Sequence, residues 1–384
     1  MNIKTLNKIS PVGLKEFNES YKICDDCQTP DAILVRSASM HEMEMPESLL
    51  SIARAGAGVN NIPVEKCAEQ GIVVFNTPGA NANAVKELAL ATLLLASRDI
   101  IGGVEWARTL EGDDVAKQVE KGKSNFAGGE IMGKTLGVVG LGAIGVNVAN
   151  SAYTLGMKVC GYDPYMSVKS AWKLSRHVSI AMSLDEIYEK ADIICIHAPL
   201  TDETKGFVNA DTIAKMKDGV VICNLSRAGL VNDDDMAAAL ESGKVKKYVT
   251  DFPNEKTIKM KNCISIPHLG ASTEESEDNC AVMAARQTID YLENGNIVNS
   301  VNYPTVEMAR SGQARICICH KNVPSVLSNI STVISSQGIN IENMINKSKG
   351  DFAYTVVDCC SPISEHAHKA IEGIADVIRV RVIK

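Results

Sequence analysis

The sequence lacks both a long apolar run and an excess of positive charge, and each absence excludes a class of protein. No apolar run approaches the roughly 18–20 residues that are needed to cross a bilayer, and residues 1–10 contain no signal-peptide core. The 46 acidic residues outnumber the 39 lysines and arginines, which gives a net charge of −7 and a pI near 5.6. This balance argues against a nucleic-acid or membrane partner. The composition therefore agrees with a cytoplasmic enzyme that acts on a small molecule.

The sequence also lacks the cysteine spacing of a metal site. Cys24 and Cys27 form a Cys-x-x-Cys pair, but no second pair with matching spacing follows, so we expect no bound metal. A zinc or redox pair at this position is the less favoured alternative. Twelve cysteines in a long chain without a signal segment are typical of reduced thiols rather than of a disulfide framework. The sequence therefore predicts that the cysteines are thiols.

The 384 residues are enough for two or three domains, and strand-like and helix-like segments alternate along them. Short apolar runs predict buried parallel strands at 32–35, 71–75, 135–139, 157–162, 193–196, 220–223, 248–250 and 264–266. Helices are expected at 84–101, 143–155 and 274–293, and a loop at 117–129. This alternation predicts an α/β fold with two doubly wound parallel sheets of the Rossmann or flavodoxin type.

The residues from 312 onward follow a different order. Their segments read β-α-β-β-α-β, at 314–319, 325–337, 339–346, 352–359, 365–373 and 377–382. This order predicts a ferredoxin-like unit. The predicted domains are a discontinuous one of residues 1–83 and 274–306, an inserted one of residues 84–273, and a tail of residues 312–384.

Gly140, Gly142 and Gly145 form a G-x-G-x-x-G motif between a predicted strand and a predicted helix. In such a motif the first glycine makes a tight turn, the second admits a pyrophosphate beside the backbone, and the third lets the helix pack on the strand. The N–H groups at the start of the helix, at Ala143 and Ile144, are placed to hold the phosphate charge.

Asp163 ends the next predicted strand, eighteen residues after Gly145. An acid in this position accepts hydrogen bonds from the adenosine ribose diol and repels a 2′-phosphate, which favours NAD over NADP. Glycines also make ordinary turns, but the strand, the helix and the acid together favour a dinucleotide site.

Three polar or glycine-rich loops lie before this motif, at 36–39, 53–60 and 76–81. The first and the last follow predicted strands directly. Because ligands of parallel sheets bind beyond the carboxyl ends of the strands, these loops are candidates for a substrate site. Plain turn chemistry is the alternative for each loop.

Five motifs occur in an order that is specific in combination. They are Gly-Leu-Gly-Ala-Ile-Gly (140–145), His-Ala-Pro-Leu-Thr (197–201), Asn-Leu-Ser-Arg (224–227), Glu255, and Pro-His-Leu-Gly-Ala-Ser-Thr (267–273). On these motifs nearly the whole chain resembles the D-2-hydroxyacid dehydrogenases. Among them it is similar to the members that oxidise 3-phospho-D-glycerate and carry a C-terminal ACT domain.

The resemblance implies three catalytic residues. His268 would exchange the hydroxyl proton of the substrate, because imidazole transfers protons near neutral pH. Glu255 would fix the tautomer of His268 and stabilise the imidazolium. Arg227 would bind the substrate carboxylate and polarise the 2-oxo group. Taken singly, each of them has a structural histidine or a surface charge as its alternative.

The resemblance also implies further contacts with the cofactor NAD, at His197, Pro199, Leu225, Ser226, Asp251 and Gly270. Two departures from the family pattern occur here. The aspartate that usually stands two residues before the phenylalanine directly precedes Phe252 in this chain, as Asp251. Ala228 separates Arg227 from the glycine that usually follows it. Neither departure removes a catalytic group.

Substrate residues are implied in the early loops. Arg36 matches the position that binds the 3-phosphate, with a solvated loop charge as the alternative. The residues implied for the carboxylate are Ala57, Gly58, Val59 and Asn81.

In the tail, His320, Asn322 and Asn340 match the residues with which ACT domains of this family bind L-serine at a paired interface. Ser325 replaces a glycine that is usual in the family. An ACT unit that serves only assembly is the alternative to a serine site.

The sequence therefore predicts NAD-dependent oxidation of 3-phospho-D-glycerate to 3-phosphohydroxypyruvate by a homo-oligomer, dimeric or tetrameric. One alternative is a dehydrogenase for another D-2-hydroxy acid, such as glycerate or 2-hydroxyglutarate. The other is an NAD-sensing protein without turnover, similar to the corepressors that share the fold.

Overall fold

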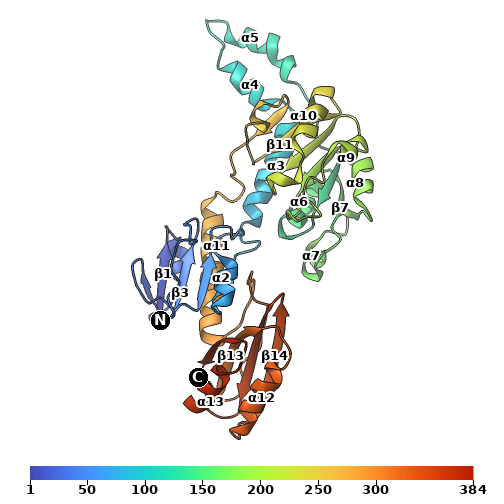
Figure 1. The fold of residues 1–384 in the computed structure, drawn as a ribbon. Coiled ribbons are helices and arrows are strands. Elements are labelled where there is room, and N and C mark those ends of the chain that lie inside the picture. The colour runs from blue at the N-terminus through green and yellow to red at the C-terminus, as the bar shows by residue number, and fades with distance from the viewer. Residues whose placement is uncertain (384) are drawn as a thin grey trace. The chain divides into compact units, whose positions relative to one another are not determined.

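The computed structural model describes residues 1–383, and these form two compact units (Figure 1). The first unit comprises residues 1–80 and the chain from 274 onward, and the second comprises residues 81–273. No helix in residues 1–383 combines the length and the apolarity that a membrane span requires.

A five-stranded parallel sheet in the order β2-β1-β3-β4-β5 forms the base of the first unit. Its strands are β1 (Asn2–Leu6), β2 (Lys22–Cys24), β3 (Ala32–Val35), β4 (Ser51–Arg54) and β5 (Val73–Phe75). Its helices are α1 (Pro11–Leu14), α2 (Val64–Glu69) and α11 (Glu274–Asn294). Helix α11 packs on β3, β4 and β5, and α1 packs so closely on α11 that Gly13 has no room for a side chain beside Ala281.

The second unit contains a seven-stranded parallel sheet in the order β12-β11-β10-β9-β6-β7-β8. Its strands are β6 (Thr135–Val139), β7 (Lys158–Tyr162), β8 (Ser179–Ile180), β9 (Ile193–Ile196), β10 (Val220–Asn224), β11 (Val245–Thr250) and β12 (Cys263–Ser265). Helices α3 (Ala82–Ser97) and α6 (Ala143–Thr154) share one apolar core with the sheet. Helices α8 (Leu184–Lys190), α9 (Ala210–Ala214) and α10 (Asp233–Ser242) share another, while α7 (Val168–Lys173) packs on α6. The predicted doubly wound parallel sheets are confirmed.

The order of the strands reverses between β6 and β9. After β6 the chain continues to β7 and β8 on one side, and it then crosses to β9 on the other side. Ligands of open parallel sheets bind beyond the carboxyl ends of the strands at such a reversal. The fold therefore predicts a ligand site at the loops after β6, β7, β9 and β10.

Two predictions for the second unit were wrong. The segment expected to be a loop, 117–129, contains most of helix α5 (Val115–Gly122) and a 3₁₀ turn (Lys123–Phe126). The single helix expected at 84–101 ends instead at an extended residue, Arg98, and α4 (Ile100–Ala107) follows it. The rings of Trp106 and Phe126 pack 5.2 Å apart. This contact joins the largely apolar α4 to the polar 3₁₀ turn after α5, and neither segment alone predicts it. Figure 1 shows α4 and α5 extending away from the sheet of their unit.

The tail has the predicted β-α-β-β-α-β order. Its elements are β13 (Ala314–Lys321), α12 (Val326–Ser336), β14 (Ile341–Lys349), β15 (Phe352–Cys359), α13 (Glu365–Glu372) and β16 (Val377–Ile383). The sheet is antiparallel, in the order β14-β15-β13-β16. This is the predicted ferredoxin-like arrangement.

One face of the tail sheet packs into the core of the first unit. Cys317, Cys319 and Tyr354 belong to the same buried cluster as Phe75 and Tyr291. The tail is therefore part of the first compact unit. Its separate regulatory role, and the three-domain division based on it, stay predictions.

The cysteine prediction needs a correction at one pair. Cys24 and Cys27 form a disulfide, with 5.8 Å between their Cα atoms, and the other ten cysteines are free thiols. The bridge closes the turn between β2 and β3. The three-residue separation shows only that the two thiols can meet, because the backbone of the turn decides whether they do.

Candidate active site

The glycine motif has the backbone geometry of a dinucleotide site. Gly140 has a φ of +93°, and a Cβ at this position would lie 2.7 Å from the carbonyl carbon of His197. A Cβ on Gly145 would overlap the carbonyl oxygen of Gly140, so α6 can approach β6 only with glycine here. Gly142, in contrast, has no atom within 4 Å of its Cβ position and begins α6 without a side-chain cap. The first turn of α6 thus faces open space with the N–H groups that phosphate binding requires.

Asp163 follows β7 beside this motif. Its Oδ2 accepts the backbone N–H of Leu141 and its Oδ1 accepts that of Tyr165, each at 2.8 Å. The bond to Leu141 connects the acid to the residue between the first two glycines of the motif. Because a carboxylate oxygen has two lone pairs, Asp163 keeps acceptor capacity for a ribose diol.

A pocket of about 800 Å³ opens beside the motif, within the second unit. Five predicted cofactor residues line it: Gly140, Gly142, Asp163, His197 and Pro199. Sequence reasoning gave no role to the other lining residues, which are Val139, Tyr162, Pro164, Tyr165, Leu184, Ala198, Thr201, Asp202, Glu203, Thr204 and Phe207. The motif at 197–201 marked the start of the loop after β9, but no pattern showed how far the loop continues along the pocket. Asp202 and Glu203 add negative charge to the pocket, which disfavours a 2′-phosphate.

His197 is held in its neutral form. Burial lowers its pKa to about 4. Its Nε2 lies 3.2 Å from Sγ of Cys195, and among residues 1–383 its Nδ1 has no hydrogen-bond partner. The pocket therefore gains a polar ring without gaining a positive charge.

The loop after β10 carries Arg227, and the fully buried Asn224 shapes this loop. Asn224 accepts the N–H of Ser226 at 3.2 Å and donates its Nδ2 to the carbonyl of Arg227 at 2.9 Å. Ser226 donates its hydroxyl to the carbonyl of Ala198, which connects this loop to the one after β9. Leu225 is buried in the core, whereas Arg227 is exposed and keeps donors for a substrate carboxylate. Sequence reasoning quoted Asn224 in a motif but gave it no role.

His268 lies in the loop after β12, close to residues that follow β11. The ring centroids of His268 and Phe252 are 4.8 Å apart. A Cβ on Gly270 would lie 3.4 Å from Oδ2 of Asp251. Burial raises the pKa of Asp251, and the charges of His268 and Arg227 oppose this rise. The structure thus brings His268, Arg227 and Asp251 to one region of the second unit.

Glu255 is placed differently. Its side chain is exposed just before the 3₁₀ turn Thr257–Lys259, and within residues 1–383 it makes no ion pair or hydrogen bond. The neighbouring Asn254 is anchored by a 2.9 Å bond from its Nδ2 to Asp233. The predicted pairing of Glu255 with His268 is therefore not formed here, and the catalytic role of Glu255 stays a prediction.

The predicted substrate residues of the first unit are connected by Arg54. Its Nε donates to the carbonyl of Arg36 at 2.8 Å, and its Nη1 donates to the carbonyl of Gly58. The side chain of Arg36 forms an ion pair with Glu277 of α11, with 2.7 Å between Nη2 and Oε1. The sequence analysis gave Arg54 no role, although its position at the carboxyl end of β4 could have indicated a residue of the substrate site.

The remaining substrate candidates lie in turns. The carbonyl of Ala57 accepts a bond of 2.7 Å from Nδ2 of Asn76, and the carbonyl of Val59 accepts one of 3.0 Å from the N–H of Ile62. Asn81 is the N-cap of α3, in the second unit, and its side chain makes no capping bond.

The tail does not bring its three predicted serine ligands together within one chain. Both ring nitrogens of the buried His320 are engaged, at 2.7 Å from the carbonyl of Lys321 and 2.9 Å from the hydroxyl of Thr355. Asn322 follows the end of β13. Asn340 directly precedes β14. The first residues of β14 and β13, Ile341 and Ala314, both pair with Cys359 of β15, so Asn340 lies at the end of the sheet where β13 begins. Asn340 and His320 therefore lie at opposite ends of the sheet.

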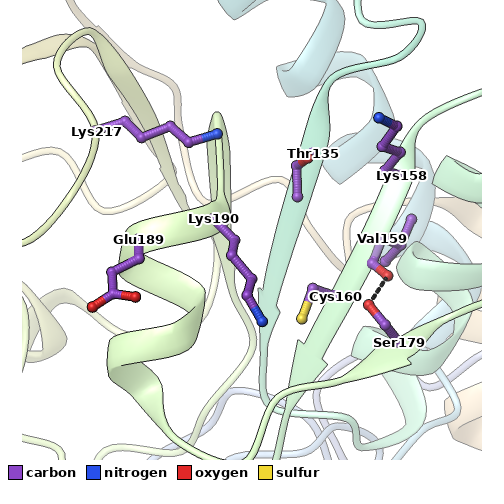
Figure 2. A pocket seen from close by; sticks show the side chains of 8 residues that line it. All are labelled: Thr135, Lys158, Val159, Cys160, Ser179, Glu189, Lys190 and Lys217. Carbon is purple, nitrogen blue, oxygen red and sulfur yellow. Dashed lines mark hydrogen bonds between the residues drawn. The ribbon is translucent and has the colours of Figure 1, made fainter.

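A second pocket, of about 450 Å³, lies at the amino-terminal ends of β6 and β7 (Figure 2). Lys158, Lys190 and Lys217 surround it. Lys190 pairs with Glu186 and Lys217 with Asp192, each at 3.0 Å. The pocket is at the end of the sheet opposite the glycine motif, and its lysines are solvated surface charges, so we assign it no ligand.

The site and the fold together define a dinucleotide-binding protein. Residues 90–270 match the family model described as D-isomer specific 2-hydroxyacid dehydrogenase, NAD binding domain. The putative D-3-phosphoglycerate dehydrogenase of Schizosaccharomyces pombe is 31% identical over 373 residues, 89% of this chain and 76% of that protein. The chain belongs to the D-isomer specific 2-hydroxyacid dehydrogenase family, and its cofactor is NAD.

Other relatives cover different shares of their own length. The D-3-phosphoglycerate dehydrogenase of Methanocaldococcus jannaschii is 33% identical, and the match covers 82% of this chain. The chain spans 59% of that relative and 54% of its namesake from Synechocystis. The cofactor (NAD+) bound 3-phosphoglycerate dehydrogenase of Entamoeba histolytica has the same fold, with a TM-score of 0.60 and 27% identity over 79% of this chain and 98% of that one.

Proposed function

We propose that this protein uses NAD to oxidise 3-phospho-D-glycerate to 3-phosphohydroxypyruvate, a step of L-serine synthesis. The observation that carries the proposal is that Arg227 and His268 both lie close enough to Asp251 for their charges to act on it, in the unit that holds the glycine motif. The names of the relatives from M. jannaschii and Synechocystis support the substrate.

NAD fits the pocket by its geometry and its charge. The open space at Gly142 and the first turn of α6 suit a pyrophosphate. Asp163, Asp202 and Glu203 favour a free ribose diol over a 2′-phosphate. We assign Ser226 and Gly270 to the nicotinamide side, together with Leu225 as an apolar support.

The chemistry needs a base for the hydroxyl proton and a cation for the substrate carboxylate. NAD, when bound, supplies the acceptor for the hydride that leaves C2. His268 takes the hydroxyl proton on a ring nitrogen, and Arg227 binds the carboxylate and polarises the forming 2-oxo group. The family resemblance assigns the orientation of His268 to Glu255, which is exposed in this chain.

The phosphate is assigned to Arg36, and the substrate carboxylate to the backbone N–H groups at 57–59 and to Asn81. Arg54 supports this assignment, because it holds the loops of Arg36 and Gly58 together. Glu277 competes with the phosphate for Arg36. Removing Arg36 should therefore weaken binding of phosphorylated acids more than binding of unphosphorylated acids.

The tail is assigned to L-serine feedback in a homo-oligomer. His320 and Asn322 lie at one end of its sheet and Asn340 at the other, so a complete site requires two copies of the tail. The proposal places the enzyme in the cytoplasm, with no nucleic-acid or membrane partner.

A second candidate substrate is an unphosphorylated 2-oxo acid. The protein of Thermotoga maritima named hydroxypyruvate reductase is 38% identical over 259 residues, which are 80% of that protein. This relative favours a D-2-hydroxy acid without phosphate.

The deciding experiment follows NADH fluorescence while the purified protein reduces 3-phosphohydroxypyruvate or a panel of unphosphorylated 2-oxo acids, with and without L-serine. Preference for the phosphorylated acid, lost in Arg36→Ala, supports the proposal. Preference for another acid overturns the phosphate assignment but keeps the dehydrogenase. NADH binding without turnover of any acid favours an NAD-sensing protein instead.

A further inference from the structure

Asp251 is a buried acid whose carboxylate is left unpaired. The residue directly follows β11 and is 1% exposed. Within the described chain neither Oδ1 nor Oδ2 accepts a hydrogen bond of normal geometry, and the backbone N–H groups of Asp251 and Gly270 interact with the carboxylate only weakly. An ionised carboxylate without a partner is costly to bury, so it is retained where a cation or a ligand completes it.

Two points of contact join Asp251 and Phe252 to the loop of His268. The ring of Phe252, the next residue, packs against the imidazole with a centroid distance of 4.8 Å. Gly270, two residues after His268, approaches so closely that a Cβ there would touch Oδ2 of Asp251 at 3.4 Å. The peptide segments that carry the acid and the imidazole are therefore packed on each other.

The charges around Asp251 indicate which neighbouring group stabilises its carboxylate. Burial raises the pKa of this carboxyl, and the largest opposing contribution is the charge of His268. The backbone N–H groups of Asp251 and Gly270 and the charge of Arg227 act in the same direction as His268, but less strongly. His268 is thus the neighbour that most favours the ionised form of Asp251.

We propose that Asp251 is a positioning residue, whose buried carboxylate orients the imidazole of His268 and stabilises its protonated form. This inference rests on the proposed function of His268. It assigns to Asp251 the task that the family pattern gives to Glu255, which is solvent-exposed in this chain. It also differs from a contact between Asp251 and the nicotinamide amide, which would act on cofactor affinity.

The proton transferred in the reaction is held by His268, so a change at Asp251 should alter the basicity of His268. In the oxidation, the O–H bond of the substrate breaks and an N–H bond forms on His268, while the hydride leaves C2 with the electron pair of the C–H bond. Asp251 takes up no proton and remains an anion. An anion beside the imidazolium lowers the free energy of that state, so its removal makes His268 a weaker base.

The test compares Asp251→Asn with Glu255→Gln, and with Asp234→Asn as the control for a lost surface carboxylate. In the direction of reduction, kcat/KM falls with rising pH as the imidazolium is lost. We expect the midpoint of this fall to move down by about one pH unit or more in Asp251→Asn. The dissociation constant for NADH should stay within about twofold, because the acid acts through His268. Asp251→Ser is the second variant if Asp251→Asn does not fold.

The titration of the His268 imidazole by NMR gives a readout that does not depend on turnover. Its resonance is identified by its loss in His268→Asn. The same downward shift in Asp251→Asn supports the proposal even if no acid is turned over, in which case only the proposed function fails. An unmoved midpoint with weaker NADH binding assigns Asp251 to the nicotinamide amide and overturns the proposal. A midpoint that moves only in Glu255→Gln overturns it as well.

Discussion

Arg315 and Asp358 form a bidentate ion pair in which neither side chain is exposed to solvent. Nε of Arg315 lies 2.7 Å from Oδ1 of Asp358, and Nη2 lies 2.8 Å from Oδ2. The remaining donors of Arg315 reach the carbonyls of Asn294, Met308 and Ala309 at 2.8–3.0 Å. The pair therefore connects two strands of the tail to the end of α11 and to the segment that joins them.

Removing one member of this pair should destabilise the first unit strongly. We expect Asp358→Ala to lower the free energy of unfolding by about 3–5 kcal/mol, because it leaves a buried guanidinium without its anion. Urea unfolding measures the loss. Glu16→Ala is the matched control, since its partner Arg286 is exposed and such pairs contribute little. Equal losses of unfolding free energy in the two variants would show that the buried pair stabilises the fold no more than an exposed pair does.

The same carboxylate predicts a pH dependence. Burial alone raises the pKa of Asp358, but hydrogen bonds from Arg315 and Ser311 outweigh burial and hold the pKa below its usual value. A carboxyl whose pKa is lower in the folded than in the unfolded chain stabilises the fold above its unfolded pKa, and this stabilisation is lost as the pH falls through the folded pKa. We expect the free energy of unfolding to decrease below about pH 4. Urea midpoints across this range should change less in Asp358→Asn, and an equal change in both proteins would contradict the assignment.

Two glycines of the motif should respond differently to alanine. Gly142 has open space around its Cβ position and a φ of −74°, so Gly142→Ala should fold normally and lose NADH affinity at least tenfold, because the methyl group takes the place of the pyrophosphate. Gly145→Ala should lower the unfolding temperature, because its methyl group collides with the carbonyl of Gly140. Fluorescence titration and thermal unfolding measure the two effects. Tight NADH binding by Gly142→Ala would place the pyrophosphate elsewhere.

Asp163 should determine the choice of dinucleotide. Asp163→Ser removes the charge that repels a 2′-phosphate, while a hydroxyl remains for the neighbouring N–H groups. We expect the ratio of NADPH to NADH affinity to rise by at least tenfold. Asp185→Ser, at an exposed acid that pairs with Lys215, is the control and should leave the ratio unchanged. If the ratio is unmoved in both variants, Asp163 does not contact the ribose.

The disulfide predicts a thiol count. Alkylation of the unfolded, unreduced protein should modify ten cysteines, and prior reduction should raise the number to twelve. Mass spectrometry of the labelled protein measures both numbers. The double variant Cys24→Ser/Cys27→Ser should give ten in both states. Twelve reactive thiols before reduction would return Cys24 and Cys27 to the reduced form that the sequence predicts.

Local sequence patterns were sufficient to predict those features whose residues all lie in one short segment of the chain. The glycine motif and Asp163 lie on consecutive elements, so spacing alone predicted the strand, the helix and the acid, and the structure places all three beside one pocket. The β-α-β-β-α-β order of the tail was predictable for the same reason, because its strands and helices follow one another directly along the chain. The identities of His268 and Arg227 followed from motifs, whereas their mutual placement did not.

The tertiary structure alone decided the features that depend on residues far apart in the chain. It packed Phe126, just after α5, against Trp106 of α4, and it joined the tail to the core of the first sheet through Cys317, Tyr354 and Phe75. It also exposed Glu255 and buried Asp251 beside the loop of His268. The sequence determined which residues are present and which local elements they form. Burial, and with it the charge each acid can carry, is a property of the packed neighbours, which no local pattern contains.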